Sequence, residues 1–105
     1  MTPAWQHGRL GDASVAPAEG EVTRFVARLS GAIVEEIHSG ALPEPVDYSS
    51  DIDEWVVVLA GSATLVVDGE QLELTAGGWV LLPAGTPHTL VHTEPGTHWL
   101  TVTGS

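Results

Sequence analysis

The stretch of sequence that decides the fold lies at residues 77–88. It reads Gly77-Gly78-Trp79-Val80-Leu81-Leu82-Pro83-Ala84-Gly85-Thr86-Pro87-His88. Its apolar run, residues 79–82, has the length of a short buried strand. Proline fixes φ and cannot donate to a sheet ladder, so Pro83 and Pro87 mark a rigid corner between two strands. The stretch therefore predicts a strand, a corner and a second strand that begins near His88.

Outward from this corner, the chain reads as short strands separated by turn residues. Val, Thr and Leu recur in these segments, and none has the i, i+3, i+4 spacing of an amphipathic helix. Asp68-Gly69, between two of the segments, favours a two-residue hairpin turn. Strands of this number and spacing predict an all-β sandwich or closed barrel. The predicted strands are residues 22–29, 32–38, 55–60, 63–67, 70–74, 79–82, 87–93 and 97–103.

The length of 105 residues allows one domain. Residues 1–20 contain two prolines and three glycines and predict a loosely ordered N-terminal arm, whereas residues 21–105 form the barrel. The longest apolar run, residues 55–60, is too short to cross a bilayer. The first residues contain no long apolar stretch of the kind found in a signal peptide, so a cytoplasmic location is expected.

The charge of the chain restricts its partners. Fourteen acidic residues face three arginines and no lysine, which gives a net charge of −11. Nucleic acids and anionic membranes bind through Lys and Arg, so neither is an expected partner. Two explanations of the negative charge stay open: solubility or adaptation to a salty cytoplasm on one side, and electrostatic attraction of a cationic ligand on the other. The absence of cysteine excludes disulfides, thiolate catalysis and cysteine-type zinc sites.

Two spaced patterns in this chain resemble the motifs of the cupin family. The second cupin motif corresponds to Gly77, Pro83, Gly85 and His88, with His92 where the family has Asn. The latter half of the first motif corresponds to Glu54 followed, after six residues, by Gly61. At the place of its His-x-His pair, this chain has Tyr48-x-Ser50 or, with the longer spacing, Asp47-x-Ser49. The resemblance covers residues 47–92 and implies an antiparallel double-stranded β-helix, or jelly-roll barrel.

The resemblance also implies a site inside the barrel. Glu54 and His88 stand where family members have inward-facing metal ligands. Side chains alternate along a strand, so His92 is expected to share the inward face of His88, and His98 lies on the more apolar face of residues 97–103. The expected metal ligands are Glu54, His88 and His92, and the ion is Zn, Fe, Mn or Ni; a site without metal is the alternative.

Four further side chains are candidates for contact with a ligand: Tyr48, Ser50, His92 and His98. Purely structural roles for the two central site residues also stay open. Glu54 is then a solvated carboxylate at a strand start, and His88 a structural histidine bonded to a carbonyl. His38 is expected to be a structural residue of its strand without a functional role. Asp51 and Asp53 are read as a solvated loop.

Three functions remain in competition at this point. The first is an enzyme acting on a small organic molecule, with Glu54 and His88 as catalytic acid, base or metal ligands. The second is a small-molecule binding or sensing module without catalysis, and the third is a dimeric scaffold. Trp55 and Trp99 have the opposite parity to Glu54 and His98, so both are expected to leave the cavity. Outward aromatic side chains, together with the resemblance, predict a homodimer.

Overall fold

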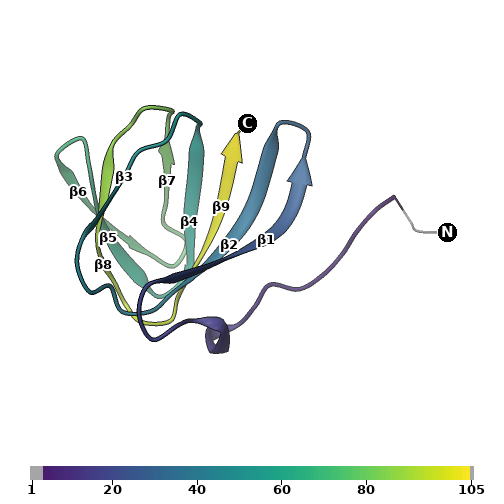
Figure 1. Cartoon of the computed structure of the whole chain (residues 1–105), viewed down its shortest axis with the longest axis horizontal. Coiled ribbons are helices and arrows are strands. Elements are labelled where there is room, and N and C mark those ends of the chain that lie inside the picture. The colour runs from purple at the N-terminus through teal and green to yellow at the C-terminus, as the bar shows by residue number, and fades with distance from the viewer. Residues whose placement is uncertain (1–3, 105) are drawn as a thin grey trace.

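Two antiparallel sheets face each other in the computed structural model, which describes residues 4–104 (Figure 1). One sheet has the strand order β1-β2-β9-β4-β7 and the other has the order β3-β8-β5-β6. The predicted all-β barrel is therefore confirmed. The strands are β1 (Glu21–Leu29), β2 (Ala32–Ser39), β3 (Val46–Tyr48), β4 (Glu54–Ala60), β5 (Ser62–Val67), β6 (Glu70–Thr75), β7 (Trp79–Leu82), β8 (His88–Thr93) and β9 (Thr97–Gly104).

The turns form where the sequence predicted them. Asp68 and Gly69 between β5 and β6 both have positive φ, 49° and 80°, as the two-residue hairpin turn requires. At the corner after β7, Gly85 also has a positive φ of 81°, and its amide donates to the Ser50 carbonyl at 2.7 Å. This bond ties the corner to the loop before β4, so it holds the starts of β4 and β8 in one region of the barrel.

The core fills the space between the two sheets. It contains a cluster of apolar side chains from five strands: Val56, Val58, Ala63, Leu65, Leu74, Leu90 and Trp99. Trp99 is 4% exposed, so the expectation that it leaves the cavity is wrong. In β9 the buried residues Thr97, Trp99 and Thr101 face inward, and His98 faces outward. The face of β9 that carries His98 is apolar for another reason: it lies partly under the N-terminal segment on the outside of the barrel.

The N-terminal segment has two parts. Residues 11–20, which include the 3₁₀ turn η1 (Ala13–Val15), contact the barrel. Backbone bonds join Ala41 to the Ala18 carbonyl and Gly40 to the Gly20 carbonyl, at 2.9 and 2.8 Å. Residues 4–10 run outward past the edge of the five-stranded sheet (Figure 1), and residues 6–10 line a hollow together with residues 24–27 of β1. Within residues 4–104, no helix has the length and apolarity needed to cross a membrane.

Candidate functional site

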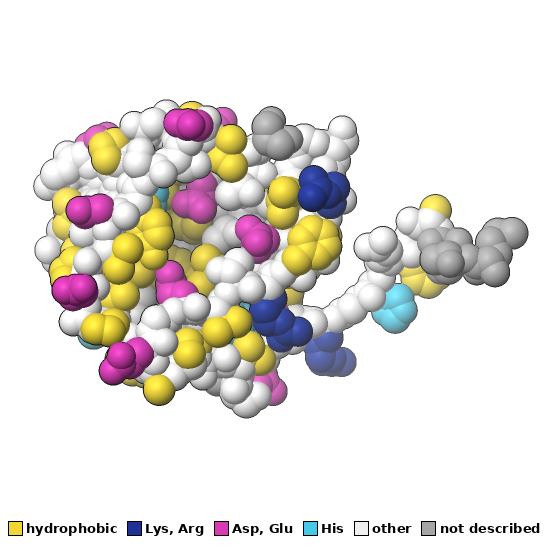
Figure 2. All heavy atoms as spheres, in the orientation of Figure 1, with side chains coloured by type: hydrophobic (Ala, Val, Ile, Leu, Met, Phe, Trp, Pro, Cys, Tyr) yellow, Lys and Arg dark blue, Asp and Glu magenta, His cyan; other side chains and the backbone are white. Residues whose placement is uncertain are grey.

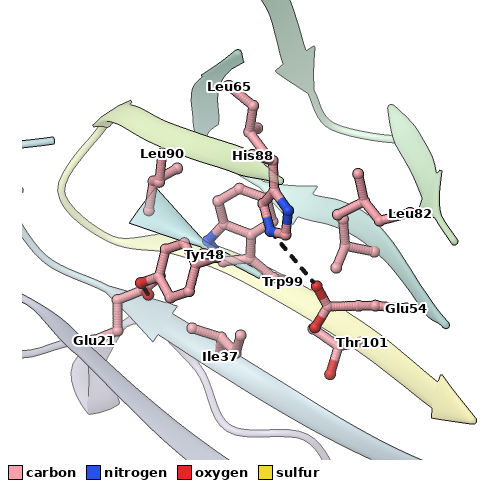
Figure 3. Close-up of a pocket in the computed structure, with 11 residues that line it drawn as sticks. Glu21, Ile37, Tyr48, Glu54, Leu65, Leu82, His88, Leu90, Trp99 and Thr101 are labelled. Carbon is pink, nitrogen blue, oxygen red and sulfur yellow. Dashed lines mark hydrogen bonds and ion pairs between the residues drawn. The ribbon is translucent and has the colours of Figure 1, made fainter. Parts of the chain in front are cut away.

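A cavity of about 100 Å³ opens between the sheets. Figure 2 shows it as a hollow with apolar walls and acidic side chains near its mouth. Side chains from both sheets converge on it in Figure 3. The lining residues are Glu21, Ile37, Tyr48, Glu54, Val56, Leu65, Leu82, His88, Leu90, Trp99 and Thr101.

Glu54 and His88 face each other in this cavity. The distance from His88 Nε2 to Glu54 Oε1 is 3.9 Å, and the two side chains are 9% and 29% exposed respectively. His88 Nδ1 lies 3.1 Å from the Thr86 carbonyl oxygen. Because a carbonyl only accepts, Nδ1 carries the hydrogen of this bond, and in the neutral ring Nε2 presents a lone pair to the cavity. The pair therefore combines a potential base with a carboxyl group.

The protonation of Glu54 is shifted by its surroundings. Burial raises the pKa of the Glu54 carboxyl above its ordinary value. His88 acts in the opposite direction, and the charges of Glu35 and Glu21 reinforce the rise. The protonated form of Glu54 consequently persists to higher pH than that of an exposed glutamate.

Tyr48 forms one wall of the site. Its ring stacks on His88, with centroids 5.7 Å apart and an interplanar angle of 17°. Its hydroxyl donates to Glu21 Oε1 at 3.2 Å. Burial, followed by the charge of Glu21 and this hydrogen bond, raises the pKa of Tyr48 to about 12. Tyr48 is therefore a neutral hydrogen-bonded group that positions the imidazole of His88.

A chain of hydrogen bonds continues from Tyr48 into the core. Ser39 Oγ donates to Glu21 Oε2 at 2.7 Å, and Trp99 Nε1 donates to Ser39 Oγ at 2.9 Å. Glu21 thus accepts from two hydroxyl groups, and the indole nitrogen of a core residue has its partner. These bonds fix one wall of the cavity before any ligand arrives.

Ser50 and His92 lie elsewhere. Ser50 is exposed in the loop before β4, where its Oγ accepts from the Ile52 amide at 3.2 Å. His92 is also exposed, so the expectation that it shares the inward face of His88 is wrong. Thr64 pairs with His92 and Leu65 pairs with Leu90, which makes Val91 an extra residue in β8. This bulge reverses the alternation of side chains along the strand.

The donor set in the cavity does not fit the metal site that the family resemblance implied. Glu54 and His88 provide one carboxylate and one imidazole, and Tyr48 in the lost histidine position is a neutral phenol bonded to Glu21. Glu21 is the other carboxylate of the lining, but both its oxygens already accept hydrogen bonds, from Tyr48 and Ser39. Two protein ligands are fewer than a zinc site uses. The expected set Glu54, His88 and His92 is not brought together. Within residues 4–104, three potential metal donors lie within 4.8 Å of one another in a different place: Glu36, His38 and His98.

That group lies on the outer face of the five-stranded sheet and is called the outer cluster below. The expectation that His98 faces the cavity is wrong, because its neighbours Trp99 and Thr101 occupy the inward positions of β9. His98 is paired with His38 across β2 and β9, and their rings stack with centroids 4.2 Å apart. Glu36, two residues before His38, shares that face of β2.

Glu36 is the centre of the outer cluster. Its carboxylate lies 3.0 Å from His98 Nε2 and 3.6 Å from His38 Nε2. Burial acts to raise the pKa of Glu36, but hydrogen bonds from the Gly11 amide and His98, with the charges of both imidazoles, outweigh it and lower the pKa. Both His38 nitrogens are buried without a hydrogen-bond partner in the part of the chain that the structure describes. Such groups cost about 1–3 kcal/mol each when left unsatisfied.

The sequence contained only half of the signal for the outer cluster. Glu36 and His38 have the i, i+2 spacing of one strand face, within the predicted strand 32–38. Their meeting with His98 depends on the pairing of β2 with β9, which are separated by about 60 residues. No local pattern encodes that pairing, so the sequence alone predicts no role for His38.

Comparison with known proteins gives the family. The family model of the cupin domain matches residues 33–103. The chain belongs to the cupin family. This cupin is 30% identical to a protein from Ralstonia eutropha JMP134 provisionally named as a mannose-6-phosphate isomerase, with a TM-score of 0.76. The match covers 93% of this chain and 99% of that chain.

Two more distant solved structures share the fold of this cupin. A cupin superfamily protein from Desulfitobacterium hafniense DCB-2 has 18% identity and a TM-score of 0.75, over 94% of this chain and 92% of that chain. KdgF from Halomonas sp. has 19% identity and a TM-score of 0.74, over 81% and 80%.

A curated relative matches over a shorter stretch. Quercetin 2,3-dioxygenase of Bacillus subtilis (strain 168) is 40% identical over 45 residues. This stretch is 43% of the present cupin and 13% of the enzyme. The match therefore covers far less than two thirds of the enzyme.

Proposed function

We propose that this cupin binds a small uncharged organic molecule in the barrel cavity and exchanges a proton with it through Glu54 and His88, without a metal at that position. The observation that carries the proposal is the 3.9 Å separation of Glu54 Oε1 and His88 Nε2 inside the cavity. This separation is too long for a direct hydrogen bond. A ligand lying beside the pair, off the line that joins Oε1 and Nε2, can bring one atom to about 3 Å from each group and so be within reach of both.

The size and charge of the cavity favour a small molecule without a phosphate. An engineered apolar cavity of about 150 Å³ holds benzene, so about 100 Å³ suits a molecule of roughly four to six heavy atoms. The lining residues include two glutamates and neither Lys nor Arg. A phosphate group would meet carboxylates there and no cation. The name of the Ralstonia relative therefore supports a carbonyl compound, but the cavity does not support its phosphorylated form.

The reaction class that fits the pair is proton transfer next to a carbonyl group. Neutral His88 would take a proton from the carbon beside the carbonyl through Nε2, and protonated Glu54 would give its proton to the carbonyl oxygen. With an α-hydroxy carbonyl compound the product of this step is an enediol. Protonated His88 can return its proton to either of the two carbons, while the Glu54 carboxylate takes the proton of the hydroxyl group that becomes the carbonyl. Thr86 holds the tautomer of His88 that the step requires. The raised pKa of Glu54 increases the fraction of acid available for it.

A second candidate function, reversible binding without catalysis, rests on the hydrogen-bonded wall of the cavity. Tyr48, Ser39 and Trp99 are all engaged with Glu21 or with one another. This leaves Glu54 and His88 as the groups that face a ligand with their polar atoms, which suffices for recognition. The two functions differ in whether the bound molecule exchanges a carbon-bound proton.

The proposal is tested with dihydroxyacetone, an uncharged hydroxyketone. In ordinary water we expect this compound to shift the amide NMR signals of Leu90 and Thr101, and in deuterated water we expect the protein to accelerate deuterium uptake at its hydroxymethyl carbons. Loss of the base in His88→Gln, or of the acid in Glu54→Gln, is expected to slow uptake by about 100-fold or more. His92→Gln, which alters an exposed histidine, is the matched control and keeps the rate. Dihydroxyacetone phosphate is expected to leave the same signals unshifted.

The possible outcomes separate the two candidate functions. Amide shifts with no deuterium uptake would support the binding function and contradict catalysis. Uptake that persists in both cavity variants would place the chemistry elsewhere. Absence of both shifts and uptake would contradict a site for this class of molecule in the cavity.

A further inference from the structure

We propose that the outer cluster, Glu36, His38 and His98, is a binding site for a divalent metal ion, with Zn²⁺ as the best-fitting ion, and that the N-terminal segment covers it at Gly11. The site is separate from the barrel cavity. Trp99 and Thr101 line the cavity, whereas His98 between Thr97 and Trp99 faces the opposite side of β9. The inference does not depend on the proposed cavity function.

The strands bring the three donor groups together before any ion binds. One donor atom from each residue lies within 4.8 Å of the other two. Glu36 and His38 are fixed on β2, and His98 is fixed opposite His38 on β9. β2 and β9 are both interior strands of the five-stranded sheet. Donors on such strands keep their positions better than donors on loops, so the entropy lost on metal binding is small.

His38 provides an observation that hydrogen bonding alone leaves unexplained. Its side chain is fully buried, and neither ring nitrogen has a hydrogen-bond partner within residues 4–104. The 3.6 Å distance from Nε2 to Glu36 Oε1 is longer than a hydrogen bond. A metal ion bound at Nε2 would satisfy the nitrogen that faces Glu36. The stacking of the two imidazoles directs both rings to the same side of the sheet.

The N-terminal segment supplies the surroundings that metal sites typically have. The Gly11 amide lies 3.1 Å from each oxygen of Glu36, so a backbone donor orients the carboxylate. Gly11 also passes directly over the imidazole, because a Cβ atom there would lie 3.0 Å from His38 Nε2. The segment thus shields the buried donors from water, and a glycine allows the close approach.

Arg24 is the group that competes with an ion for Glu36. Its Nη1 lies 3.5 Å from Glu36 Oε1, and its side chain is 47% exposed. Glu36 itself is buried, with its side chain 3% exposed, but the half-exposed guanidinium keeps contact with water and can leave the carboxylate for solvent when an ion binds there. The chain has a net charge of −11, which favours uptake of a dication over retention of one arginine contact.

The chemistry of the donors selects the class of ion. Two imidazoles and one carboxylate suit Zn²⁺ and other first-row divalent ions, whereas Mg²⁺ and Ca²⁺ prefer oxygen ligands. Three protein ligands leave a fourth position of a tetrahedral zinc ion for water or a further group.

The test uses the full chain, freed of metal and titrated with Zn²⁺ against a chromophoric chelator at neutral pH. We expect one Zn²⁺ per chain. Loss of a group that only hydrogen-bonds to a metal ligand weakens metal binding by about 10- to 100-fold, so loss of a ligand itself in His98→Ala or Glu36→Gln is expected to weaken it by more than about 100-fold. His92→Ala removes an exposed histidine and is the matched control, with unchanged binding. His88→Ala separates this site from the cavity and is also expected to bind normally.

A second measurement on the unaltered chain avoids any variant that fails to fold. Zn²⁺ is expected to shift the imidazole NMR signals of His38 and His98 and to leave those of His88 and His92 in place. Co²⁺ in place of Zn²⁺ is expected to give the intense visible absorption of a four-coordinate site. Absence of stoichiometric binding would overturn the proposal. Binding that is lost in His88→Ala, or imidazole shifts confined to other histidines, would overturn it as well.

Discussion

At the scale of single residues, the burial of Glu54 in the cavity favours its proposed role as an acid but lowers the stability of the folded protein at neutral pH. A carboxylate that water no longer solvates is harder to ionise, so burial raises its pKa. The folded state therefore holds the Glu54 proton more tightly than the unfolded chain does. The contribution of this residue to stability is fully present below the ordinary value of 4.5 and is lost as the pH rises through the folded pKa.

Glu54→Gln is expected to raise the stability of the protein at pH 7–8. Glutamine has nearly the same shape and no charge, so the variant avoids the burial of a carboxylate; the expected gain in the free energy of unfolding is about 0.5–1 kcal/mol. Below pH 4 the two proteins are expected to converge. Urea denaturation of both proteins between pH 4 and pH 8 measures this. A variant less stable than the parent at pH 8 would contradict the electrostatic account.

Ser39 links the core to the cavity wall through two hydrogen bonds. Ser39→Ala removes the acceptor of the buried Trp99 indole and one donor to Glu21. We expect a loss of about 1–3 kcal/mol in the free energy of unfolding, since the indole nitrogen then stays buried without a partner. Ser62→Ala, which removes an exposed hydroxyl bond to Glu94, is the control and should change stability by less than about 0.5 kcal/mol. Equal losses in the two variants would show that the hydrogen bonds of Ser39 add no more to the free energy of unfolding than an exposed one does.

At the scale of elements, backbone irregularities decide which side chains face the cavity. Sequence alternation correctly predicted the turn at Asp68-Gly69, the barrel and its strands except β3, because these depend on local propensity and on close-range motifs. The three residues of β3 (Val46–Tyr48) are too few to give a pattern. It placed His92 wrongly, because the extra residue Val91 reverses the alternation after Leu90. A bulge of this kind leaves no distinct local pattern in a strand such as residues 87–93.

The positions of Glu54 and His88 were predictable only through the cupin resemblance, which located the ends of β4 and β8. The outer cluster was not predictable in the same way. Its assembly needs the register of β2 against β9, and both the choice of partner strand and the register follow from the packing of the whole barrel. The prediction of which face of β9 points into the cavity was also wrong. Apolar residues indicate that a face is buried, but they do not indicate whether the opposite sheet or the N-terminal segment covers that face.

The hairpin turn between β5 and β6 gives a test at the scale of one element. Gly69 has φ of 80°, and a Cβ atom there would meet nothing within 4 Å. Gly69→Ala is therefore expected to cost about 1–2 kcal/mol through backbone strain alone. Gly8→Ala is the matched control, because Gly8 also has open space around it and no positive φ. Thermal denaturation compares the variants, and equal melting temperatures would contradict a strained turn.

At the scale of the whole molecule, the edge strand β1 is the most exposed part of the five-stranded sheet. Its side chains are almost all exposed, and Phe25 is 62% exposed. An edge strand with apolar side chains is a natural place for strand pairing or sheet packing between copies. We propose that the homodimer predicted from the sequence forms through β1.

Sedimentation at micromolar concentration tests this proposal. We expect a dimer, and we expect Phe25→Glu to shift it to monomer by placing a charge in the interface. Leu81→Glu on the opposite edge strand β7 makes the same change at a 55% exposed residue and should leave the dimer intact. A monomeric parent protein would contradict a dimer altogether. Dissociation by Leu81→Glu alone would assign the interface to the other edge.

The close succession of His98 and Trp99 along β9 has a practical consequence. His98 belongs to the outer cluster, and the next residue, Trp99, lines the cavity. The fluorescence of Trp99 can therefore respond to binding on either side of the sheet. Trp99 is 4% exposed, whereas Trp5 and Trp79 are 69% and 59% exposed and Trp55 is half-buried, so Trp99 is expected to emit at the shortest wavelength of the four. Fluorescence at the blue edge of the spectrum thus offers an intrinsic optical reporter, without any attached dye, for events on either face of this strand.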